Sequence, residues 1–319
     1  MLLKLAISAS AIAFVVYRLN LSAVIDRTAH QNLGDLGAAA AVMLAQLALG
    51  ALRWHVIRLK IGIRSSFLDT FRIYYIGSFF ASYVWSGISG DIVRVWLSWR
   101  YGASRGAALY STILDRVALI AGIAVLIILT SPWFFVRFGF SVEGWLPFLA
   151  AVTLLVGIVG LAQFDRLPIT WRQWLPLRLL GSLGGAAREV FLRPRTVLPA
   201  IGTAMIGQAA LGLATYILAQ SLGINVMLTD CIVVMQIVAL LTAVPISIGG
   251  WGVREMSMVG LFGLVDIPAS SALVLSVQLG LIGLALNLPG GIFWLIARPQ
   301  ARSAGDFSLS ALYGRSAQP

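Results

Sequence analysis

The chain has 319 residues, of which 59% are hydrophobic and only 11% are charged, and its formal net charge is +11. Soluble domains carry about 25% charged residues, so this composition argues against a soluble globular enzyme, whose surface needs more polar side chains. It also argues against a disordered chain, which requires low hydrophobicity. A disulfide framework is excluded because Cys231 is the only cysteine in the sequence. The composition indicates an integral membrane protein.

Six stretches are apolar over about the 20 residues that a helix needs to cross a membrane. They are Leu2–Tyr17, Leu36–Leu52, Ala107–Thr130, Trp145–Phe164, Val197–Leu222 and Ser270–Ala297. The first could be mistaken for a signal peptide. Only Lys4 precedes its apolar run, however, and no clear small-residue cleavage site follows, so we expect a retained helix.

Two further stretches, Tyr74–Trp99 and Asp230–Val265, are apolar but are interrupted by glycine-rich breaks with charges beside them. Glycine and proline at such density interrupt a helix. Irregular backbone at membrane depth persists only where it is buried in protein or lines a wet cavity. We therefore predict two re-entrant helical hairpins, with pairs of short spanning helices as the alternative.

The basic residues predict the orientation of these helices. Most of the 23 Lys and Arg residues fall in the segments Arg53–Arg72, Arg94–Arg105, Phe164–Arg195 and Arg298–Arg315. Only Arg18, Arg27 and Arg137 would lie on the opposite face. Because cytoplasmic loops are enriched in Lys and Arg, we predict a multi-pass protein of the cell (inner) membrane with both termini in the cytoplasm. The first hairpin would then enter from the cytoplasm and the second from outside.

An internal repeat would relate the two hairpins. A shift of 160 residues superimposes Ile88, Gly90, Val93 and Arg94 on Ile248, Gly250, Val253 and Arg254. The helices before and after each hairpin coincide under the same shift, and the predicted orientations of the two units are opposite. Inverted repeats with broken helices are typical of transporters.

Five segments resemble a known family in their order and spacing. They are Arg53-Trp54, Tyr75–Phe80, Ser89–Arg94, Leu114-Asp115-Arg116 and Pro245–Glu255. Together they resemble the flippase-like membrane domain of the lysylphosphatidylglycerol synthase family, the UPF0104 group, over about residues 2 to 300. The first hairpin departs from the family pattern twice, because Trp85-Ser86 replace a usual proline and Ser89 replaces the first residue of Gly-Gly-Asp.

The resemblance implies a protein that moves, or helps to move, lipid-linked substrates between leaflets. The synthases carry a soluble aminoacyl-transferase domain after the membrane part, whereas this sequence has about twenty residues after its last predicted helix. We therefore expect no synthase chemistry and no cofactor. We expect one polytopic membrane domain over residues 1–300 and a short, disordered cytoplasmic tail over residues 301–319.

The charges in the apolar segments are candidate substrate-binding residues, because charges at membrane depth are costly and usually functional. The candidates are Asp91, Arg94, Asp115, Arg116, Arg254 and Glu255, together with Gly90, Gly249, Gly250 and Gly252 of the two breaks. Neighbours in sequence do not face each other on a helix. We therefore expect Asp115 and Arg116 to have different partners, as well as Arg254 and Glu255, within one neutral set. Two structural alternatives stay open. The charges, instead of binding a head group, would only lock the hairpins against the bundle. The glycines, instead of exposing helix amides to a phosphate, would only allow tight packing.

The function that we expect is that of a lipid flippase or translocase, not an enzyme. The alternative is a non-catalytic membrane scaffold for a glycosyltransferase or lipid-modifying enzyme. A membrane-embedded enzyme is disfavoured, since no Glu-x-x-His or His-Glu-x-x-His spacing suggests a metal site. The expected partners are membrane lipids and such an enzyme, but no nucleic acid. The sequence does not determine whether the protein forms an oligomer.

Overall fold

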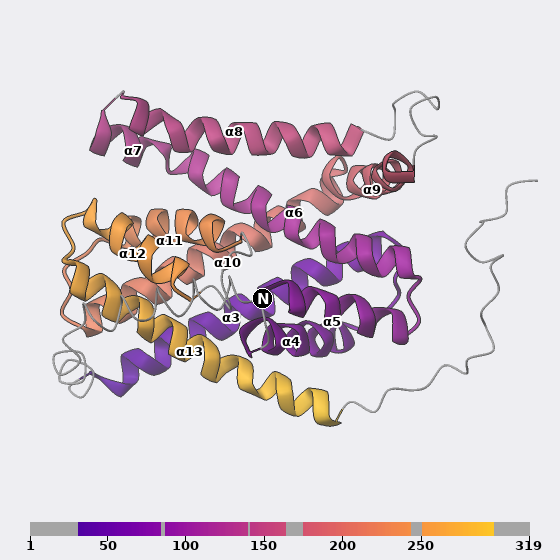
Figure 1. Cartoon of the computed structure of the whole chain (residues 1–319), viewed down its shortest axis with the longest axis horizontal. Coiled ribbons are helices and arrows are strands. Elements are labelled where there is room, and N and C mark those ends of the chain that lie inside the picture. Colours follow the sequence, from indigo (N-terminus) through magenta and orange to yellow (C-terminus); the bar gives the residue numbers. More distant parts are fainter. Residues whose placement is uncertain (1–30, 84–86, 140, 164–174, 244–250, 297–319) are drawn as a thin grey trace, which may run out of the picture.

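The structure, a computed structural model, describes residues 31–83, 87–139, 141–163, 175–243 and 251–296. Within this part of the chain the regular secondary structure is all helix and there is no strand, as predicted for an all-α membrane protein (Figure 1). Its helices are α3 (Leu33–Lys60), α4 (Phe67–Tyr83), α5 (Gly87–Arg100), α6 (Arg105–Leu129), α7 (Ser131–Phe138), α8 (Val142–Gln163), α9 (Leu175–Phe191), α10 (Pro194–Ser221), α11 (Leu228–Ala243), α12 (Val253–Gly263) and α13 (Ala269–Ile296).

Five of these helices are long and apolar enough to cross a membrane, namely α3, α6, α8, α10 and α13. Each coincides with one of the predicted spans, so the chain is a multi-pass membrane protein. The remaining predicted span, Leu2–Tyr17, and the predicted tail over residues 301–319 lie outside the described residues.

Helix α3 continues beyond the predicted end of its apolar run at Leu52 and ends at Lys60. Its first turn is capped by the side chain of Asn32, which accepts a hydrogen bond from the Gly34 amide at 2.9 Å. Its last turn carries Arg58 and Lys60, whose positive charges interact favourably with the negative end of the helix dipole and stabilise this end of the helix. Because of this extension, Arg53 is a buried residue of the helix, whereas the charge pattern placed it in a cytoplasmic segment.

Each predicted hairpin is a pair of short helices. In the first, α4 and α5 are antiparallel, since Gly77 lies against Gly90 and the Ser89 hydroxyl donates to the Phe80 carbonyl at 2.7 Å. Helix α5 begins at Gly87, so Gly90 lies within its first turn and does not precede the helix. In the second, α11 and α12 flank the other break, of which residues 244–250 lie outside the described part.

The helices repeat along the chain. A shift of about 160 residues maps α3, α4, α5 and α6 onto α10, α11, α12 and α13, and α7 to α9 lie between the two units. The contacts repeat as well. Gly50 of α3 abuts Tyr74 of α4, and Gly212 of α10 abuts Ile232 of α11. The predicted internal repeat is therefore a feature of the fold.

The two units are inverted relative to each other. Helices α3 and α10 pack along much of their length, with Ala39 in the same buried cluster as Leu218 and Ile57 in the same cluster as Ala200. Residue numbers thus rise along one helix while they fall along the other, and the helices are antiparallel. Figure 1 accordingly shows the α4–α5 hairpin towards one end of the molecule and the α11–α12 hairpin towards the other. The membrane face from which each hairpin enters stays a prediction.

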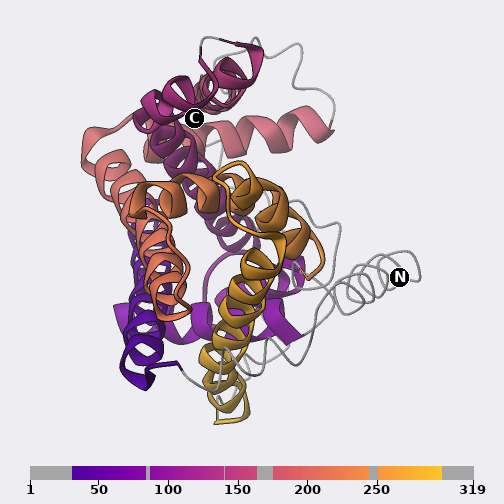
Figure 2. The same ribbon diagram turned by 90° about the vertical axis from the view of Figure 1, so that its left-hand side faces the viewer.

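Helices α7 to α9 cover one side of the repeated units, opposite α13 in both views (Figures 1 and 2). Helix α9 is seen end-on in Figure 1 and lengthwise in Figure 2, so it runs across the direction of its neighbours. It forms the second half of the basic segment Phe164–Arg195. A basic helix that lies crosswise beside a membrane bundle has the arrangement expected of a helix on the lipid surface.

Candidate functional site

Asp115 of α6 is the centre of a buried charge cluster. Its two carboxylate oxygens accept from two different arginines, Arg53 of α3 through Nε at 2.7 Å and Arg94 of α5 through Nη2 at 2.7 Å. The side chain of Asp115 is only 1% exposed. Because an ionised carboxylate is very costly to bury without partners, these two arginines hold α3, α5 and α6 together at this point.

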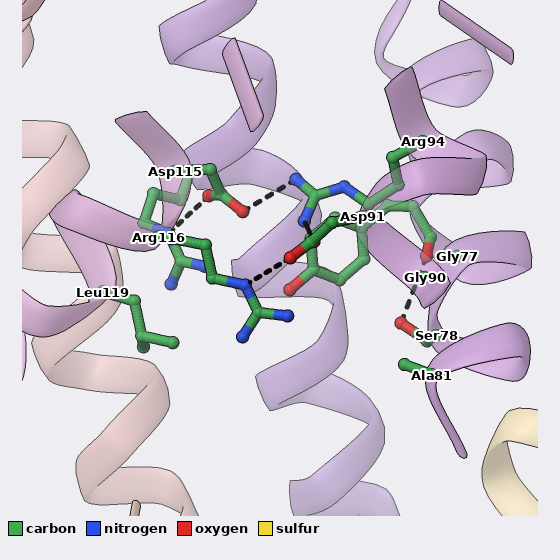
Figure 3. Close-up of a pocket in the computed structure, with 11 residues that line it drawn as sticks. Gly77, Ser78, Ala81, Gly90, Asp91, Arg94, Asp115, Arg116 and Leu119 are labelled. Atoms are coloured by element: carbon green, nitrogen blue, oxygen red, sulfur yellow. Dashed lines mark hydrogen bonds and ion pairs between the residues drawn. The ribbon is translucent and has the colours of Figure 1, made fainter. Parts of the chain in front are cut away.

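A second carboxylate extends the cluster towards its exposed side. Asp91 of α5 accepts from Nη1 of Arg94 at 3.3 Å and from Nε of Arg116 at 2.8 Å. Three arginines and two aspartates therefore alternate in one network with a net charge of +1. Figure 3 shows Arg94 and Arg116 reaching towards each other from α5 and α6, with Asp91 and Asp115 between them.

Aromatic rings support the arginines. The Arg94 guanidinium lies 4.1 Å from the ring centre of Trp54 and 4.6 Å from that of Tyr74. The Arg58 guanidinium also lies over Trp54, at 4.6 Å, and donates to the Ser98 hydroxyl at 3.1 Å. Cation–π contacts of this kind are stronger where water is excluded. They fix the arginines from a face that the carboxylates do not reach.

The cluster forms the wall of a cavity of about 90 Å³ between α3, α4, α5 and α6. A second cavity of about 210 Å³ lies between α3, α4, α6, α10 and α13, and shares Arg53, Tyr74, Ser78 and Leu119 with the first. Arg116 is the most exposed arginine of the cluster, with 41% of its side chain accessible. The cluster thus presents positive charge to polar space inside a bundle of apolar helices.

The glycines of the first hairpin make room for this arrangement. A Cβ atom added at Gly77 would lie 2.6 Å from Cγ of Arg94, and one added at Gly90 would overlap the Gly77 carbonyl oxygen. Small residues at such a crossing let two helix backbones approach closely. The geometry of Gly90 therefore supports the packing alternative, because Gly90 is inside a helix and its φ is not in the left-handed region.

The second break has a different arrangement. Arg254 of α12 pairs with its own neighbour, Glu255, through Nη2 at 2.5 Å, and its Nε donates to the Ser276 hydroxyl of α13 at 3.2 Å. The expectation that adjacent residues 254 and 255 have different partners is wrong. The long Arg254 side chain bends back over the Trp251 ring, 4.7 Å away, into space that exists because Gly280 has no side chain.

Glu255 also closes the start of α12. It is 2% exposed, and its second carboxylate oxygen accepts from the amide of Gly252. Gly252 precedes the helix with φ of 87°, a left-handed conformation that glycine adopts without strain. This amide is thus satisfied within the protein instead of being offered to a phosphate. Gly249 and Gly250 lie outside the described residues.

The sequence-predicted residues therefore come together in part. Asp91, Arg94, Asp115 and Arg116 form one network, in which Asp115 and Arg116 have different partners as predicted. Arg254 and Glu255 instead pair with each other, so the neutral set of six is wrong. Under the repeat, Arg254 occupies the place of Arg94 and Ser276 lies close to the place of Asp115. In the second unit the acidic partner comes from the neighbouring position in sequence.

Sequence reasoning missed Arg53 as a member of the cluster, as well as the supporting rings of Trp54 and Tyr74. Arg53 and Trp54 could have been found from the Arg-Trp pair near the end of the second predicted span. The charge count instead assigned this pair to a cytoplasmic segment. Among the described residues, no group of three or more His, Cys, Asp or Glu side chains could hold a metal ion.

Comparison with known proteins places the chain in a family. The family described as "Lysylphosphatidylglycerol synthase TM region" matches residues 1–291, which is nearly the whole chain and includes both hairpins and the charge cluster. No curated protein matches the chain at a significant level. The chain therefore belongs to the family of the lysylphosphatidylglycerol synthase TM region.

Proposed function

We propose that the protein is a lipid translocase, which moves or helps to move a phospholipid or lipid-linked substrate between the leaflets of the cell membrane. The observation that carries this proposal is the cluster around Asp115. It has a net charge of +1, contacts a polar cavity and lies inside a bundle of membrane helices. Charged groups at such positions are costly and usually mark a substrate pathway.

The chemistry of the cluster suits an anionic head group. Arginine presents a planar fork of N–H donors that matches phosphate oxygens in pairs. Arg116 is the arginine that a head group would reach first, since 41% of its side chain is accessible and it borders the cavity. The proposed role is transport, in which the protein shields the head group while the acyl chains stay in lipid.

The inverted repeat supports the same role. Inverted units with broken helices near a central site allow one unit to rock against the other, which exposes the site to each side in turn. The α4–α5 and α11–α12 hairpins are the broken elements here. We further propose that both termini are cytoplasmic, because the described segments rich in Arg and Lys lie at one end of the bundle (Figure 1).

A non-catalytic scaffold is the second candidate. It is favoured by the pairing of the charges, because Asp115 is saturated by two arginines and Glu255 is satisfied by Arg254, Ser276 and Gly252. Such a scaffold would position a glycosyltransferase or lipid-modifying enzyme at the membrane.

Exchange of a labelled anionic phospholipid in liposomes that contain the purified protein tests the proposal. We expect the wild-type protein to accelerate exchange, and Arg116→Gln to abolish most of the acceleration. Arg137→Gln is the matched control, since Arg137 is also paired with an aspartate, Asp266 at 2.9 Å, but lies in the last turn of α7 and borders neither cavity. Equal exchange with Arg116→Gln and the wild type would contradict the proposed site. Absence of any acceleration by the wild type would favour the scaffold.

A further inference from the structure

The two carboxylates of the charge cluster are not held equally firmly. Asp115 accepts from two arginines at 2.7 Å each, and its side chain is 1% exposed. The side chain of Asp91 is 21% exposed and accepts from Arg116 at 2.8 Å but from Arg94 only at 3.3 Å. Figure 3 shows the Asp91 carboxylate between these two arginines, at the wall of the smaller cavity. Asp91 is therefore the carboxylate of the cluster that can give way to another anion.

Asp91 occupies hydrogen-bond donors that a phosphate would use. Its two carboxylate oxygens accept from Nε of Arg116 and from Nη1 of Arg94. Arginine binds carboxylate and phosphate oxygens through the same planar fork of N–H groups. Two anions at this place also repel each other, and this repulsion is stronger inside a protein than in water. A bound phosphate and the Asp91 carboxylate would therefore compete for the same two arginines.

The volume of the smaller cavity supports this competition. A cavity of about 150 Å³ accommodates benzene, whereas the cavity beside Asp91 has a volume of about 90 Å³. A phosphodiester with the two carbons that it joins has more non-hydrogen atoms than benzene and needs more space than this. Movement of the Asp91 side chain away from Arg94 and Arg116 would supply space where the phosphate oxygens would bind.

The inverted repeat shows that the fold does not require a carboxylate at this position. A shift of 160 residues places Trp251 at the position of Asp91 and Arg254 at that of Arg94. The Arg254 guanidinium lies 4.7 Å from the centre of the Trp251 ring, and its acidic partner, Glu255, is 2% exposed. The second unit thus holds its arginine without an accessible carboxylate beside it. In the described part of the chain, the accessible carboxylate coincides with the arginine-lined cavity, which indicates a role in binding.

We propose that Asp91 competes with the phosphate of the transported lipid for Arg116 and Arg94, and thereby keeps the affinity low enough for release. A substrate pathway needs binding that is favourable enough for entry and weak enough for exit. With Asp91 the cluster has a net charge of +1, and without this carboxylate the charge would be +2. This inference rests on the proposed function, which it deepens by naming the residue that regulates binding at the same site.

The variant Asp91→Asn tests this role in the purified full-length protein. The substitution keeps the size of the side chain and removes its charge, so the affinity for a short-chain phosphatidic acid should rise about tenfold. Exchange of the labelled anionic phospholipid in liposomes should fall, because release becomes slow. A purely structural tether predicts the opposite change in affinity, since Arg116 would lose the partner that positions it and binding would weaken.

Two further variants are the controls. Asp91→Glu keeps the carboxylate, so its affinity and exchange should lie close to those of the wild type. Asp266→Asn changes the net charge of the protein by the same amount as Asp91→Asn. Asp266 pairs with Arg137 at 2.9 Å, has a side chain that is 94% exposed and borders neither cavity. We expect unchanged affinity for this variant, which separates local competition from a general gain of positive charge.

Each outcome of this experiment decides between the roles. Unchanged or weaker binding by Asp91→Asn would overturn the competition, and so would an unfolding temperature far below that of the wild type, which would show that the fold depends on Asp91. Tighter binding without slower exchange would overturn the role in release.

Failure of the proposed function would have a different result. If the wild type accelerated no exchange while Asp91→Asn still bound phosphatidic acid more tightly, translocation would be contradicted and the competition would stand. Inorganic phosphate, assayed in parallel, distinguishes a lipid from a free anion as the ligand. Binding of inorganic phosphate as tight as that of phosphatidic acid, and tightened by Asp91→Asn, would support the competition and contradict a lipid substrate.

Discussion

Asp115 is the residue on which the charge cluster depends. It holds Arg53 and Arg94 at 2.7 Å each, and both of these arginines are buried as well. We predict that Asp115→Asn lowers the stability of the protein by about 3–5 kcal/mol, because it leaves two buried guanidinium groups without their shared counter-charge. Thermal unfolding in detergent measures this loss.

Asp266→Asn is the control for this substitution. Asp266 also pairs with an arginine, Arg137 at 2.9 Å, but its side chain is almost fully exposed, and exposed ion pairs contribute little. Asparagine also tolerates the positive φ of 61° at this position. We therefore expect no measurable change. Equal unfolding temperatures for Asp115→Asn and the wild type would show that the cluster does not stabilise the fold.

Arg254 has a structural role by the same reasoning. Its removal leaves Glu255 buried with only uncharged donors, from Gly252 and Ser276. We predict that Arg254→Leu destabilises the protein and that the double variant Arg254→Leu, Glu255→Gln recovers much of the loss, because the charge that needed a partner is gone. Thermal unfolding of the single and double variants, beside lipid exchange, measures both effects. Normal stability of Arg254→Leu with lost exchange would instead favour contact between Arg254 and lipid.

The contact between α4 and α5 depends on two glycines. A methyl group at Gly90 would overlap the Gly77 carbonyl oxygen and lie 2.8 Å from the Cβ atom of Ala81. We predict that Gly90→Ala separates the two helices and displaces Asp91 and Arg94, so that lipid exchange falls sharply. Exchange and thermal unfolding together measure this change.

Gly157→Ala in α8 is the matched control for this variant, because nothing lies within 4 Å of an added methyl group there. Alanine is the better helix former by about 1 kcal/mol, so the control should be neutral or slightly stabilising. Wild-type exchange with Gly90→Ala would mean that the close approach of α4 and α5 is not required for function.

At the level of the helices, the sequence was sufficient to predict most of the fold. Apolar length determines where a spanning helix can lie, and the glycine-rich breaks separate the short helices, so both features are local. The prediction failed at the end of α3, because Arg53 and Arg58 follow the apolar run but are buried by tertiary packing. Their burial depends on the rings of Trp54 and Tyr74 and on the position of α5, which no local pattern encodes.

The charged residues show the same limit. The rule that adjacent helix residues diverge predicted the separate partners of Asp115 and Arg116, whose side chains leave one long helix in different directions. It failed for Arg254 because this residue lies in the first turn of α12, where its flexible side chain folds back to Glu255. The space that permits this comes from Gly280, which is distant in sequence.

The repeat relates the two ends of the molecule but does not make them equivalent. The first unit carries an arginine-rich network beside two polar cavities, whereas the charges of the second unit are paired locally at the start of α12. The shared architecture therefore supplies two inverted hairpins, and the side chains make the first one the better candidate for binding. This difference follows in part from side chains, since Asp115 of the first unit corresponds to the Ser276 region of the second. It also follows from the backbone, since α5 begins at Gly87 whereas α12 begins only at Val253, where Glu255 caps the helix.

The orientation of the whole molecule in the membrane is open to a direct test. Basic residues at the ends of α5 and α9 predict that Tyr101 and Leu192 face the cytoplasm, whereas Val142 and Met227 lie at the opposite ends of their helices. All four side chains are exposed, and the native Cys231 is buried, so each position can be changed to Cys in a Cys231→Ala background. We predict that an impermeant thiol reagent added to intact cells labels Val142→Cys and Met227→Cys alone, and that Tyr101→Cys and Leu192→Cys require permeabilised cells.

Swapped labelling would reverse the orientation and place the α4–α5 hairpin on the outer side. Labelling of one member of each pair would contradict the inverted arrangement of the two units, because that arrangement requires both connections of each pair to lie on one face.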